Sequence, residues 1–387
     1  MPALDVPQPE FMDDEEIAIF ADAVGKFYEK HAPEKRVLKW REDGQVDRDF
    51  WRDAGEAGLL GASVPEEYGG HGGDFRHEMV VIDQQAKHGV EGFAASLHNT
   101  VILPYLVRHG TEEQKKKYLP KLVTGELVSA IAMTEPGVGS DLQSITTTAL
   151  KDGNGYRING AKTYISNGQT ADFIIVVAKT DPNERAKGIS LMLLETEGAE
   201  GFQRGKKLDK VGMDAADTSE LFFDDVFVPA ENVLGGEEGK GFYQLMGELP
   251  QERLIIAMGA MTGIEKALET TLDFVKNRKA FGQTIWDFQN TQFVMADLKA
   301  RATAAKIFVN DCIAKHLKRE LDVPTACMAK YWVTELQGEV VDKCLQFHGG
   351  AGFINDYPIA RMYRDSRITR IFGGSNEVMK MVIARSM

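Results

Sequence analysis

The spacing of hydrophobic positions changes twice along the chain and predicts three regions. From residue 11 to about 125, apolar side chains recur every three or four positions, as Ile17, Phe20, Val24 and Phe27 do, which predicts amphipathic helices. From about 127 to 233, short β-rich runs alternate with turn sequences. From about 238 onward, long helical segments return near 251–277, 289–317 and 323–349.

The middle region carries the strand candidates, at 173–178, 189–194 and 221–223. An order of helices, then strands, then helices does not give a parallel α/β fold, and no Gly-x-Gly-x-x-Gly lies between a strand and a helix. We therefore predict an α+β protein with an N-terminal helical domain at 1–126, a middle β-barrel or sandwich at 127–234 and a C-terminal helical bundle at 235–387.

The charge balance narrows the function classes. There are 45 basic and 58 acidic side chains, a net charge of −13, which argues against a general nucleic-acid binder. Arg361, Arg364, Arg367 and Arg370 share one helix face, but we expect acids such as Asp365 to neutralise them. No apolar run reaches the roughly 20 residues that a membrane span needs.

The N-terminus and the cysteines bear on the compartment. Residues 1–5 are neither basic nor apolar enough for a secretory signal, and they are unlike an Arg-rich presequence. Cys312, Cys327 and Cys344 have no metal-binding spacing, and we expect buried thiols in a reducing compartment. We expect a cytoplasmic bacterial protein, or a mitochondrial matrix protein if the chain is a processed eukaryotic form.

Two segments of the middle region suit ligand binding. Residues 132–141 (Ala-Met-Thr-Glu-Pro-Gly-Val-Gly-Ser-Asp) let the backbone approach a ligand closely, and Thr134 and Ser140 add hydrogen-bonding side chains. Alone, this segment also fits a tight turn. Residues 162–168 (Lys-Thr-Tyr-Ile-Ser-Asn-Gly), taken alone, predict a hairpin turn on Asn-Gly.

Two further segments lie in the C-terminal region. Residues 278–283 with 288–289 offer a cation, aromatic rings and an amide, which suit a pyrophosphate and an adenine. The alternative is a helix C-terminus with a stabilising cation. Residues 346–353 (Gln-Phe-His-Gly-Gly-Ala-Gly-Phe) contain His348, for which we favour a structural role over acid–base chemistry.

These segments resemble the acyl-CoA dehydrogenase family and occur in that family's order. Residues 64–70, 110–116 and 217–223 also look like family sequence, so the resemblance runs from about 12 to 385. Residues 325–332 (Thr-Ala-Cys-Met-Ala-Lys-Tyr-Trp) are most similar to the long-chain branch. The resemblance implies the fold given above.

The resemblance also implies an FAD cofactor and indicates which residues contact it. The matching positions are Ile131, Met133, Thr134, Gly139, Ser140, Tyr164, Ile165, Ser166, Arg278, Phe281, Phe288, Gln289, Gln346, Gly349, Gly350, Ser375 and Glu377. Tyr164 and Ser166 stand where most members have Trp and Thr, and both changes keep the type of contact. The residues matching Arg278, Phe281 and Gln289 reach the FAD of a neighbouring subunit, which implies a homotetramer built as a dimer of dimers.

The catalytic base is the informative departure from the family. Many members carry the catalytic glutamate at the position of Gly373; the long-chain and isovaleryl branch uses the position of Glu252 instead. Pro250 starts or kinks a helix, which predicts that Glu252 lies near a helix beginning. The alternatives are that Glu252 only complements the helix dipole or pairs with Arg253, and that Glu248 is the base.

Other roles in the reaction follow from the resemblance. The N–H of Gly373 still serves the thioester oxygen, so the glycine removes the base and keeps this catalytic donor. Ser140, Arg253 and Gly374 are the predicted substrate contacts, with Ser140 on the phosphopantetheine arm. We also expect Gly373 and Gly374 to leave space near the reacting carbons. No metal is implied.

The implied activity is FAD-dependent α,β-dehydrogenation of an acyl-CoA thioester to the trans-2-enoyl-CoA, with electrons passed to an electron-transfer flavoprotein. A long-chain fatty acyl-CoA of β-oxidation is the leading substrate. Isovaleryl-CoA or another branched acyl-CoA is the alternative. More distant alternatives are a diverged flavoprotein oxidase and a flavoprotein of the DNA-alkylation-response type, against which the net charge of −13 and the retained Glu252 argue.

Overall fold

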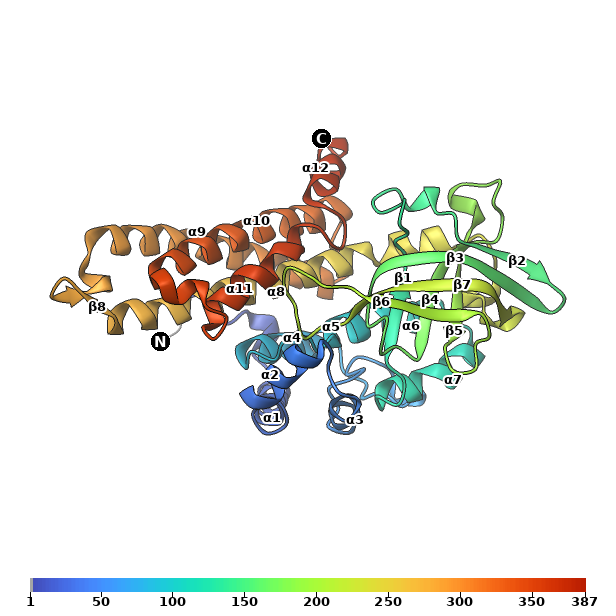
Figure 1. Ribbon diagram of the computed structural model, residues 1–387, viewed down its shortest axis with the longest axis horizontal. Helices are drawn as coiled ribbons and strands as arrows, with labels where there is room; N and C mark the ends of the chain where they lie inside the picture. The colour runs from blue at the N-terminus through green and yellow to red at the C-terminus, as the bar shows by residue number, and fades with distance from the viewer. Residues whose placement is uncertain (1–2) are drawn as a thin grey trace.

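The computed structural model describes residues 3–387 and confirms the α+β class, with a β-sheet region between two helical regions (Figure 1). Met1 and Pro2, part of the N-terminal segment considered above, lie outside the described residues. The N-terminal helices are α1 (Glu15–His31), α2 (Glu34–Asp43), α3 (Arg48–Glu56), α4 (Phe75–Lys87), α5 (Ala95–Leu97), α6 (Leu103–His109) and α7 (Glu112–Val123), with a π-helical segment η3 (His98–Ile102) joining α5 to α6.

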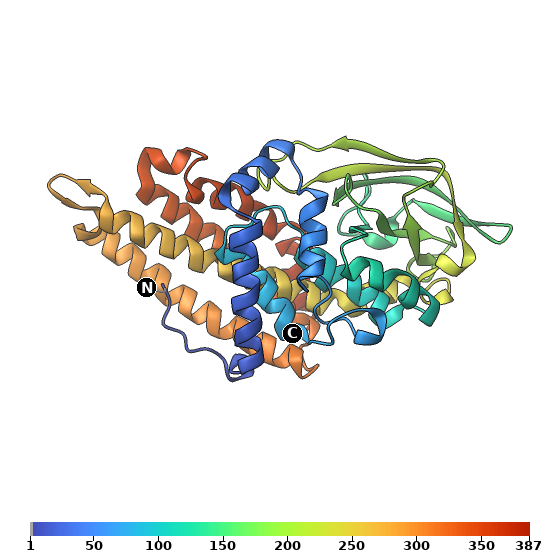
Figure 2. The same ribbon diagram turned by 90° about the horizontal axis from the view of Figure 1, so that it is seen from below.

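Local sequence accounts for the first of these helices. Asp14 caps the start of α1, where its carboxylate accepts a hydrogen bond from the Glu16 backbone N–H. Ile17, Val24 and Phe27 of the predicted stripe are buried. The N-terminal helices lie between the sheet and the outer part of the C-terminal bundle (Figure 2).

The middle region forms one curled, mixed sheet of seven strands. The strands are β1 (Ser129–Ala132), β2 (Thr148–Asp152), β3 (Gly155–Ser166), β4 (Phe173–Lys179), β5 (Ile189–Glu195), β6 (Phe202–Lys207) and β7 (Thr218–Pro229). Their order is β1–β4–β2–β3–β7–β6, and β5 also pairs with β4. β4 runs parallel to β1 and β2, and its other neighbour β5 is antiparallel.

Burial on both faces explains the uninterrupted apolar run of β4. Phe173, Ile175 and Val177 pack in one core cluster with residues of α6 and α7, whereas the alternating Ile174 and Val176 pack in a second cluster with residues of β3 and β7. A strand covered on both faces needs apolar side chains at successive positions.

The hairpin predicted at Asn167-Gly168 is wrong. β2 lies between β3 and β4 in the sheet, so the turn joins two strands that do not pair with each other. Asn167 is buried with a φ of 59°, and its side chain donates to the backbone oxygen of Ser129 at the start of β1. Asn167 is thus the left-handed residue of the turn, and its side chain ties the turn to β1.

The C-terminal region is a bundle of long helices with a small hairpin at its outer end. Its elements are α8 (Gly241–Asn277), β8 (Lys279–Ala280), β9 (Gln283–Thr284), α9 (Gln289–Leu317), α10 (Val323–His348), α11 (Pro358–Ser366) and α12 (Asn376–Arg385). Short 3-10 turns lie at 10–12, 66–68, 142–144, 186–188, 230–232, 234–236, 285–287, 349–353 and 367–370. Leu254, Met258, Met261 and Leu268 of α8 recur at helical spacing and lie in the bundle core, and the three cysteines are buried and free.

Helix α8 begins earlier than predicted, which corrects the local reading of Glu252. The helix starts at Gly241 and continues through Pro250, so Glu252 lies well inside it and away from its first turn. Because the field of the helix dipole falls off within the first turn, dipole complementation does not explain this glutamate.

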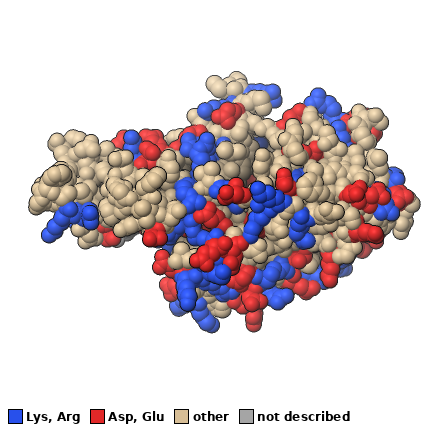
Figure 3. Space-filling model, in the orientation of Figure 1, with Lys and Arg blue, Asp and Glu red and all other residues tan. Residues whose placement is uncertain are grey.

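Acids pair with three of the four arginines at positions 361, 364, 367 and 370. Arg361 pairs with Glu91 at 2.9 Å, Arg364 with Asp214 at 2.6 Å and Arg370 with Glu335 at 3.3 Å. Asp365 instead accepts a hydrogen bond from the Met213 backbone. Acidic and basic side chains are interspersed on the face shown in Figure 3. None of the helices described within 3–387 is both long enough and apolar enough to cross a membrane.

Candidate active site

Glu252 lies where α8 packs against α6, and its carboxylate is held by a tyrosine. Glu252 is 9% exposed, and its Oε1 accepts a hydrogen bond of 2.9 Å from the hydroxyl of Tyr105, which is fully buried. Burial raises the pKa of Glu252 to about 7; the Tyr105 hydrogen bond and Arg253 oppose this, and Glu248 reinforces it. A carboxyl group with a pKa near neutrality suits general acid–base chemistry.

The alternative base, Glu248, is engaged elsewhere. Its carboxylate pairs with Arg108, and its other oxygen lies 3.0 Å from Nε2 of His109. Glu248 is 3% exposed. Both oxygens of Glu248 are thus already held by side chains of α6, so neither is free to meet a substrate proton. The geometry therefore favours Glu252 over Glu248.

Gly373 faces Glu252's own helix. It has a φ of 62°, and a Cβ added there would lie 2.2 Å from Cδ1 of Ile256, which stands one turn after Glu252 on α8. No hydrogen-bond acceptor for the Gly373 N–H is found in residues 3–387. Gly373 thus lies close to the turn of α8 that follows Glu252, and its N–H is available to a ligand.

The expected space beside these glycines is not present. Ile256 fills the volume next to Gly373, and Cε of Met379 would lie 2.7 Å from a Cβ at Gly374. Side chains from α8 and α12 have taken the room that a larger residue at 373 or 374 would occupy, so the glycines do not by themselves create a wider pocket.

A buried lysine fixes the turn that contains Gly373. Lys330 on α10 is fully buried and donates to the backbone oxygen of Gly374 at 2.8 Å and to Oδ1 of Asn376 at 2.9 Å. Burial lowers the pKa of Lys330 to about 8, and Arg253 adds to the effect. Ser375 and Glu377 follow at the start of α12, where the Ser375 hydroxyl accepts from the Val378 N–H.

The two middle-region segments lie side by side. Thr163 N–H donates to the oxygen of Thr134 at 2.9 Å, which joins β3 to the loop after β1. Lys162 and Glu135 form a buried ion pair of 2.9 Å, and Lys162 also donates to the oxygen of Met133. The Lys162 ammonium lowers the pKa of the Glu135 carboxyl to about 2 against the effect of its burial, so this pair stays charged and braces the loop.

This surface fits a flat aromatic cofactor. Tyr164 is 69% exposed with a φ of 60°, Ser166 is also exposed, and Gly139 has open space around it. An aromatic ring and a hydroxyl displayed beside free loop backbone match the stacking and hydrogen-bonding needs of a flavin. Ile131 and Ile165 differ, because their side chains pack into the core, so only their backbone is available.

Seven other predicted FAD contacts lie at the opposite end of the molecule from the sheet. Arg278, Phe281, Phe288 and Gln289 surround the β8–β9 hairpin, at the far left of Figure 1, while the sheet lies at the right. Gln346, Gly349 and Gly350 end α10 near the same place, because His348 between them contacts Thr271 of α8 at 3.3 Å. One chain does not bring this group together with the 131–166 group.

The predicted substrate contacts Ser140 and Arg253, and also His348, differ in how exposed they are. Ser140 is exposed on the loop after β1. Arg253 is buried and donates to Sγ of Cys327 on α10, and its Nε has no partner in residues 3–387. His348 is buried and stacked on Phe274 with ring centroids 4.0 Å apart, which suits the structural role expected for it. No group of three or more metal-ligating side chains is arranged to hold an ion in the described chain.

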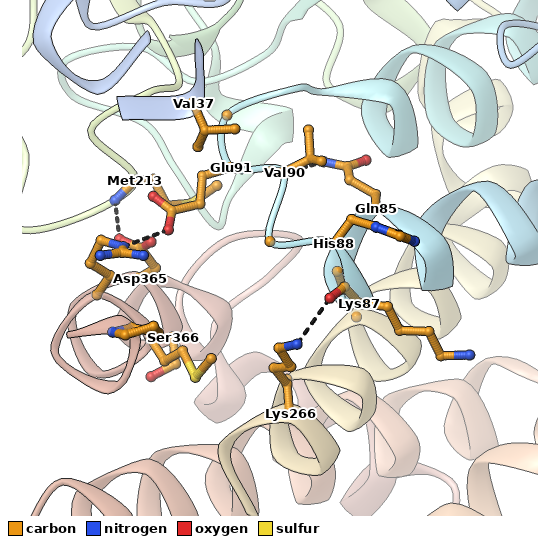
Figure 4. Close-up of a pocket in the computed structure, with 18 of the residues that line it drawn as sticks. Val37, Gln85, Lys87, His88, Val90, Glu91, Met213, Lys266, Asp365 and Ser366 are labelled. Carbon is orange, nitrogen blue, oxygen red and sulfur yellow. Dashed lines mark hydrogen bonds and ion pairs between the residues drawn. The ribbon is translucent and has the colours of Figure 1, made fainter. Parts of the chain in front are cut away.

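A cavity of about 520 Å³ lies farther along α8, on the helix face that carries Glu252. Gly259, Gly263 and Lys266 line it, and at 100° per residue they share one helix face with Glu252 and Ile256. Its other walls come from α2, the end of α4, the loop before α5 and α11, and Figure 4 shows Val37, Val90, Asp365 and Lys266 around it. Phe372, next to Gly373, also lines it.

Sequence reasoning missed several of these residues. Gly259 and Gly263 follow Glu252 at helical spacings and were detectable once that glutamate was nominated. Tyr105 was not, because 147 residues separate it from Glu252 and no local pattern links them. Lys330 resembled any other lysine of an amphipathic helix.

Comparisons with known proteins identify the family of this chain. Three family models match: the acyl-CoA dehydrogenase N-terminal domain at residues 14–126, the middle domain at 130–226 and the C-terminal domain at 239–387. The long-chain specific acyl-CoA dehydrogenase, mitochondrial, of Sus scrofa is 46% identical over 95% of this chain and 86% of its own length.

Two further relatives define the range of the similarity. The isovaleryl-CoA dehydrogenase, mitochondrial, of Pongo abelii is 39% identical over 94% of this chain and 86% of its own length. The crystal structure of an acyl-CoA dehydrogenase from Geobacillus kaustophilus superposes with a TM-score of 0.94 at 46% identity, covering 96% of this chain and 98% of that one. The chain therefore belongs to the acyl-CoA dehydrogenase family, FAD-dependent oxidoreductases that act on a CH–CH bond.

Proposed function

We propose that this protein oxidises long-chain acyl-CoA thioesters to trans-2-enoyl-CoA, with Glu252 as the base, and passes the electrons to an electron-transfer flavoprotein. The observation that carries the substrate class is the cavity of about 520 Å³ on the Glu252 face of α8. Gly263 lies eleven residues beyond Glu252, which is about 16 Å along a helix. Only a long acyl chain whose α-carbon lies at Glu252 extends that far.

The residues divide the chemistry between them. Glu252 takes the α proton: the C–H bond breaks and an O–H bond forms on its carboxylate. The Gly373 N–H donates to the thioester oxygen and stabilises the negative charge that develops there. FAD, when bound, supplies the acceptor for the β hydride. Tyr164 and Ser166 would hold its ring system, and the segment braced by Glu135 and Lys162 would line it.

The cavity gives a direct test of chain length. Gly259 lines the cavity and a Cβ there meets no atom within 4 Å, so Gly259→Leu fills empty cavity volume. Gly247→Leu is the matched control, because Gly247 is exposed on the same helix, outside the cavity lining, and is equally uncrowded. We expect kcat/KM for anaerobic flavin reduction by palmitoyl-CoA to fall about tenfold or more in Gly259→Leu. The leucine side chain occupies space that the acyl tail needs, and overfilling a packed site costs about 1–3 kcal/mol.

The same assay discriminates the alternatives. Butyryl-CoA should reduce Gly259→Leu as it reduces the wild type, because a short chain does not reach Gly259. Equal losses with both substrates would contradict the assignment of this cavity to the acyl tail. Loss of all reduction in Glu252→Gln is expected; full activity in that variant would reject Glu252 as the base.

Isovaleryl-CoA is the second candidate substrate. The 39% identity to an isovaleryl-CoA dehydrogenase keeps it open, whereas Ile256 fills the space that a β-branch near Gly373 would need. Wild-type reduction by isovaleryl-CoA but not by palmitoyl-CoA would replace the long-chain assignment. Rapid reoxidation by oxygen rather than by an electron-transfer flavoprotein would instead indicate an oxidase.

We also propose a homotetramer. The β8–β9 hairpin carries Phe281 at 96% exposure, and Phe353 at the end of α10 is 87% exposed. Further large apolar side chains are exposed along α9 and α10, namely Phe293, Ile307, Met328 and Trp332. Exposed apolar surface of this extent is typical of a subunit interface, and a second chain would bring Arg278 and Phe281 to the FAD that the first chain's sheet binds. Analytical ultracentrifugation tests this state.

A further inference from the structure

We propose that Tyr105 is a positioning residue for the base: its hydroxyl holds one carboxylate oxygen of Glu252 and leaves the other for the substrate's α proton. The inference rests on the proposed role of Glu252. Tyr105 Oη lies 2.9 Å from Glu252 Oε1. It is the only hydrogen-bond donor to this carboxylate within residues 3–387.

Burial makes this contact well defined. Tyr105 and Glu252 come from α6 and α8, and the side chains are 0% and 9% exposed. Water therefore does not replace the hydrogen bond, and a buried carboxylate with a single donor has one preferred orientation. The residual exposure of Glu252 leaves the carboxylate an open side, as a base that must reach a substrate requires.

The surrounding helix is built to hold Tyr105 at this point. The π-helical segment η3 precedes α6, and π-segments inside helices occur frequently at functional sites. In this segment the Thr100 carbonyl accepts a hydrogen bond of 2.7 Å from Nε2 of Gln251, the neighbour of Glu252. Arg108 of α6 donates to Oε1 of the same glutamine at 2.7 Å. These contacts fix α8 against η3 and α6 on both sides of the Tyr105–Glu252 pair.

The charged groups around the pair predict the direction of its effect. Glu248 and Arg253 act on the Glu252 carboxylate from α8, and Arg108 and His109 of α6 contact the two oxygens of Glu248. The Tyr105 hydroxyl stabilises the ionised form of Glu252 and so lowers its pKa against the effect of burial. Tyr105→Phe removes this donor without changing any charge, so the pKa of the base should rise.

The test is the pH dependence of flavin reduction by palmitoyl-CoA in the FAD-loaded enzyme. In Tyr105→Phe we expect the acid limb of the kcat/KM profile to move up by about one to two pH units, since a hydrogen bond to an ionised carboxylate lowers the pKa of that group by about this amount. We also expect the plateau rate to fall about tenfold, because the carboxylate loses its fixed orientation. The substrate KM should not change, because Tyr105 is placed against the base and not against CoA.

Tyr118→Phe is the matched control. Tyr118 is also buried, and its hydroxyl contacts a carboxylate, Glu195, at 3.2 Å outside the candidate site. It should lose stability without any change in the pH profile. An unshifted acid limb in a folded, FAD-loaded Tyr105→Phe would overturn the inference, while activity retained in Glu252→Gln would overturn the proposed base instead.

A second substitution covers the case in which Tyr105→Phe does not fold. Fluorotyrosine at position 105 keeps the ring and hydroxyl but makes the hydroxyl a stronger donor, so the acid limb should move down. A purely structural tyrosine would leave the limb where it is. An unmoved limb with fluorotyrosine would therefore also refute the positioning role.

Discussion

Replacing Glu252 by glutamine should stabilise the protein at neutral and alkaline pH, even though it removes the proposed base. Glu252 is buried beside Tyr105, and its burial raises the pKa to about 7 from the ordinary 4.5. The folded protein therefore holds a proton that the unfolded chain releases between these two pH values. Below about pH 4.5 the Glu252 carboxyl is protonated in both the folded and the unfolded state, so its burial does not reduce the stability of the wild type. As the pH rises from about 4.5 to about 7, the wild type loses stability.

The pKa difference sets the size of the effect. A pKa displaced from 4.5 to about 7 corresponds to about 3 kcal/mol, which is the largest gain expected for Glu252→Gln above pH 7. For a chain of 387 residues this corresponds to a shift of about 4 °C in Tm. Other buried carboxyls whose pKa is raised, such as Glu78 and Asp365, are present in both proteins, so their contributions cancel.

The assay is the thermal midpoint of both FAD-loaded proteins at matched concentration and scan rate, from pH 5 to pH 8. We expect the advantage of Glu252→Gln to grow across this range and to level off above about pH 7. A difference that does not vary with pH would show that Glu252 titrates normally in the folded protein. That result would refute both the raised pKa and the argument that burial prepares this carboxyl to act as a base.

Two further predictions concern the Gly373 turn. Gly373→Ala should lower the stability of the protein by about 1–2 kcal/mol, because φ is 62° there, and the new methyl group should also clash with Cδ1 of Ile256. Adding Ile256→Ala should relieve that clash. A double-mutant cycle of Tm values measures the coupling between the two positions, and strictly additive effects would contradict the contact. Lys330→Met should leave the backbone oxygen of Gly374 without a hydrogen-bond donor, which should lower the stability of the protein by about 1–3 kcal/mol and also lower kcat for flavin reduction. Stopped-flow rates equal to those of the wild type would show that the turn does not depend on Lys330.

Local sequence patterns correctly predicted those helices and strands that bury the same face, or both faces, along their whole length. The stripe from Ile17 to Phe27 specified α1, and the apolar run 173–178 specified β4. The same patterns failed where a distant segment decides the outcome. The Asn167-Gly168 turn was misread as a hairpin because β2 is inserted between β3 and β4. Pro250 suggested a helix start, but α8 begins at Gly241 and continues through this proline.

The sequence by itself determined the family and the absence of a glutamate at 373, and it made Glu252 the proposed base, because these depend on residue identity at matched positions. Only the tertiary structure decided what surrounds that glutamate. Tyr105, Ile256 and Lys330 come from three separate helices, and each acts on the site through a contact between residues far apart in the chain. Such contacts depend on how α6, α8 and α10 pack together, and no periodicity within one helix encodes its distance from another.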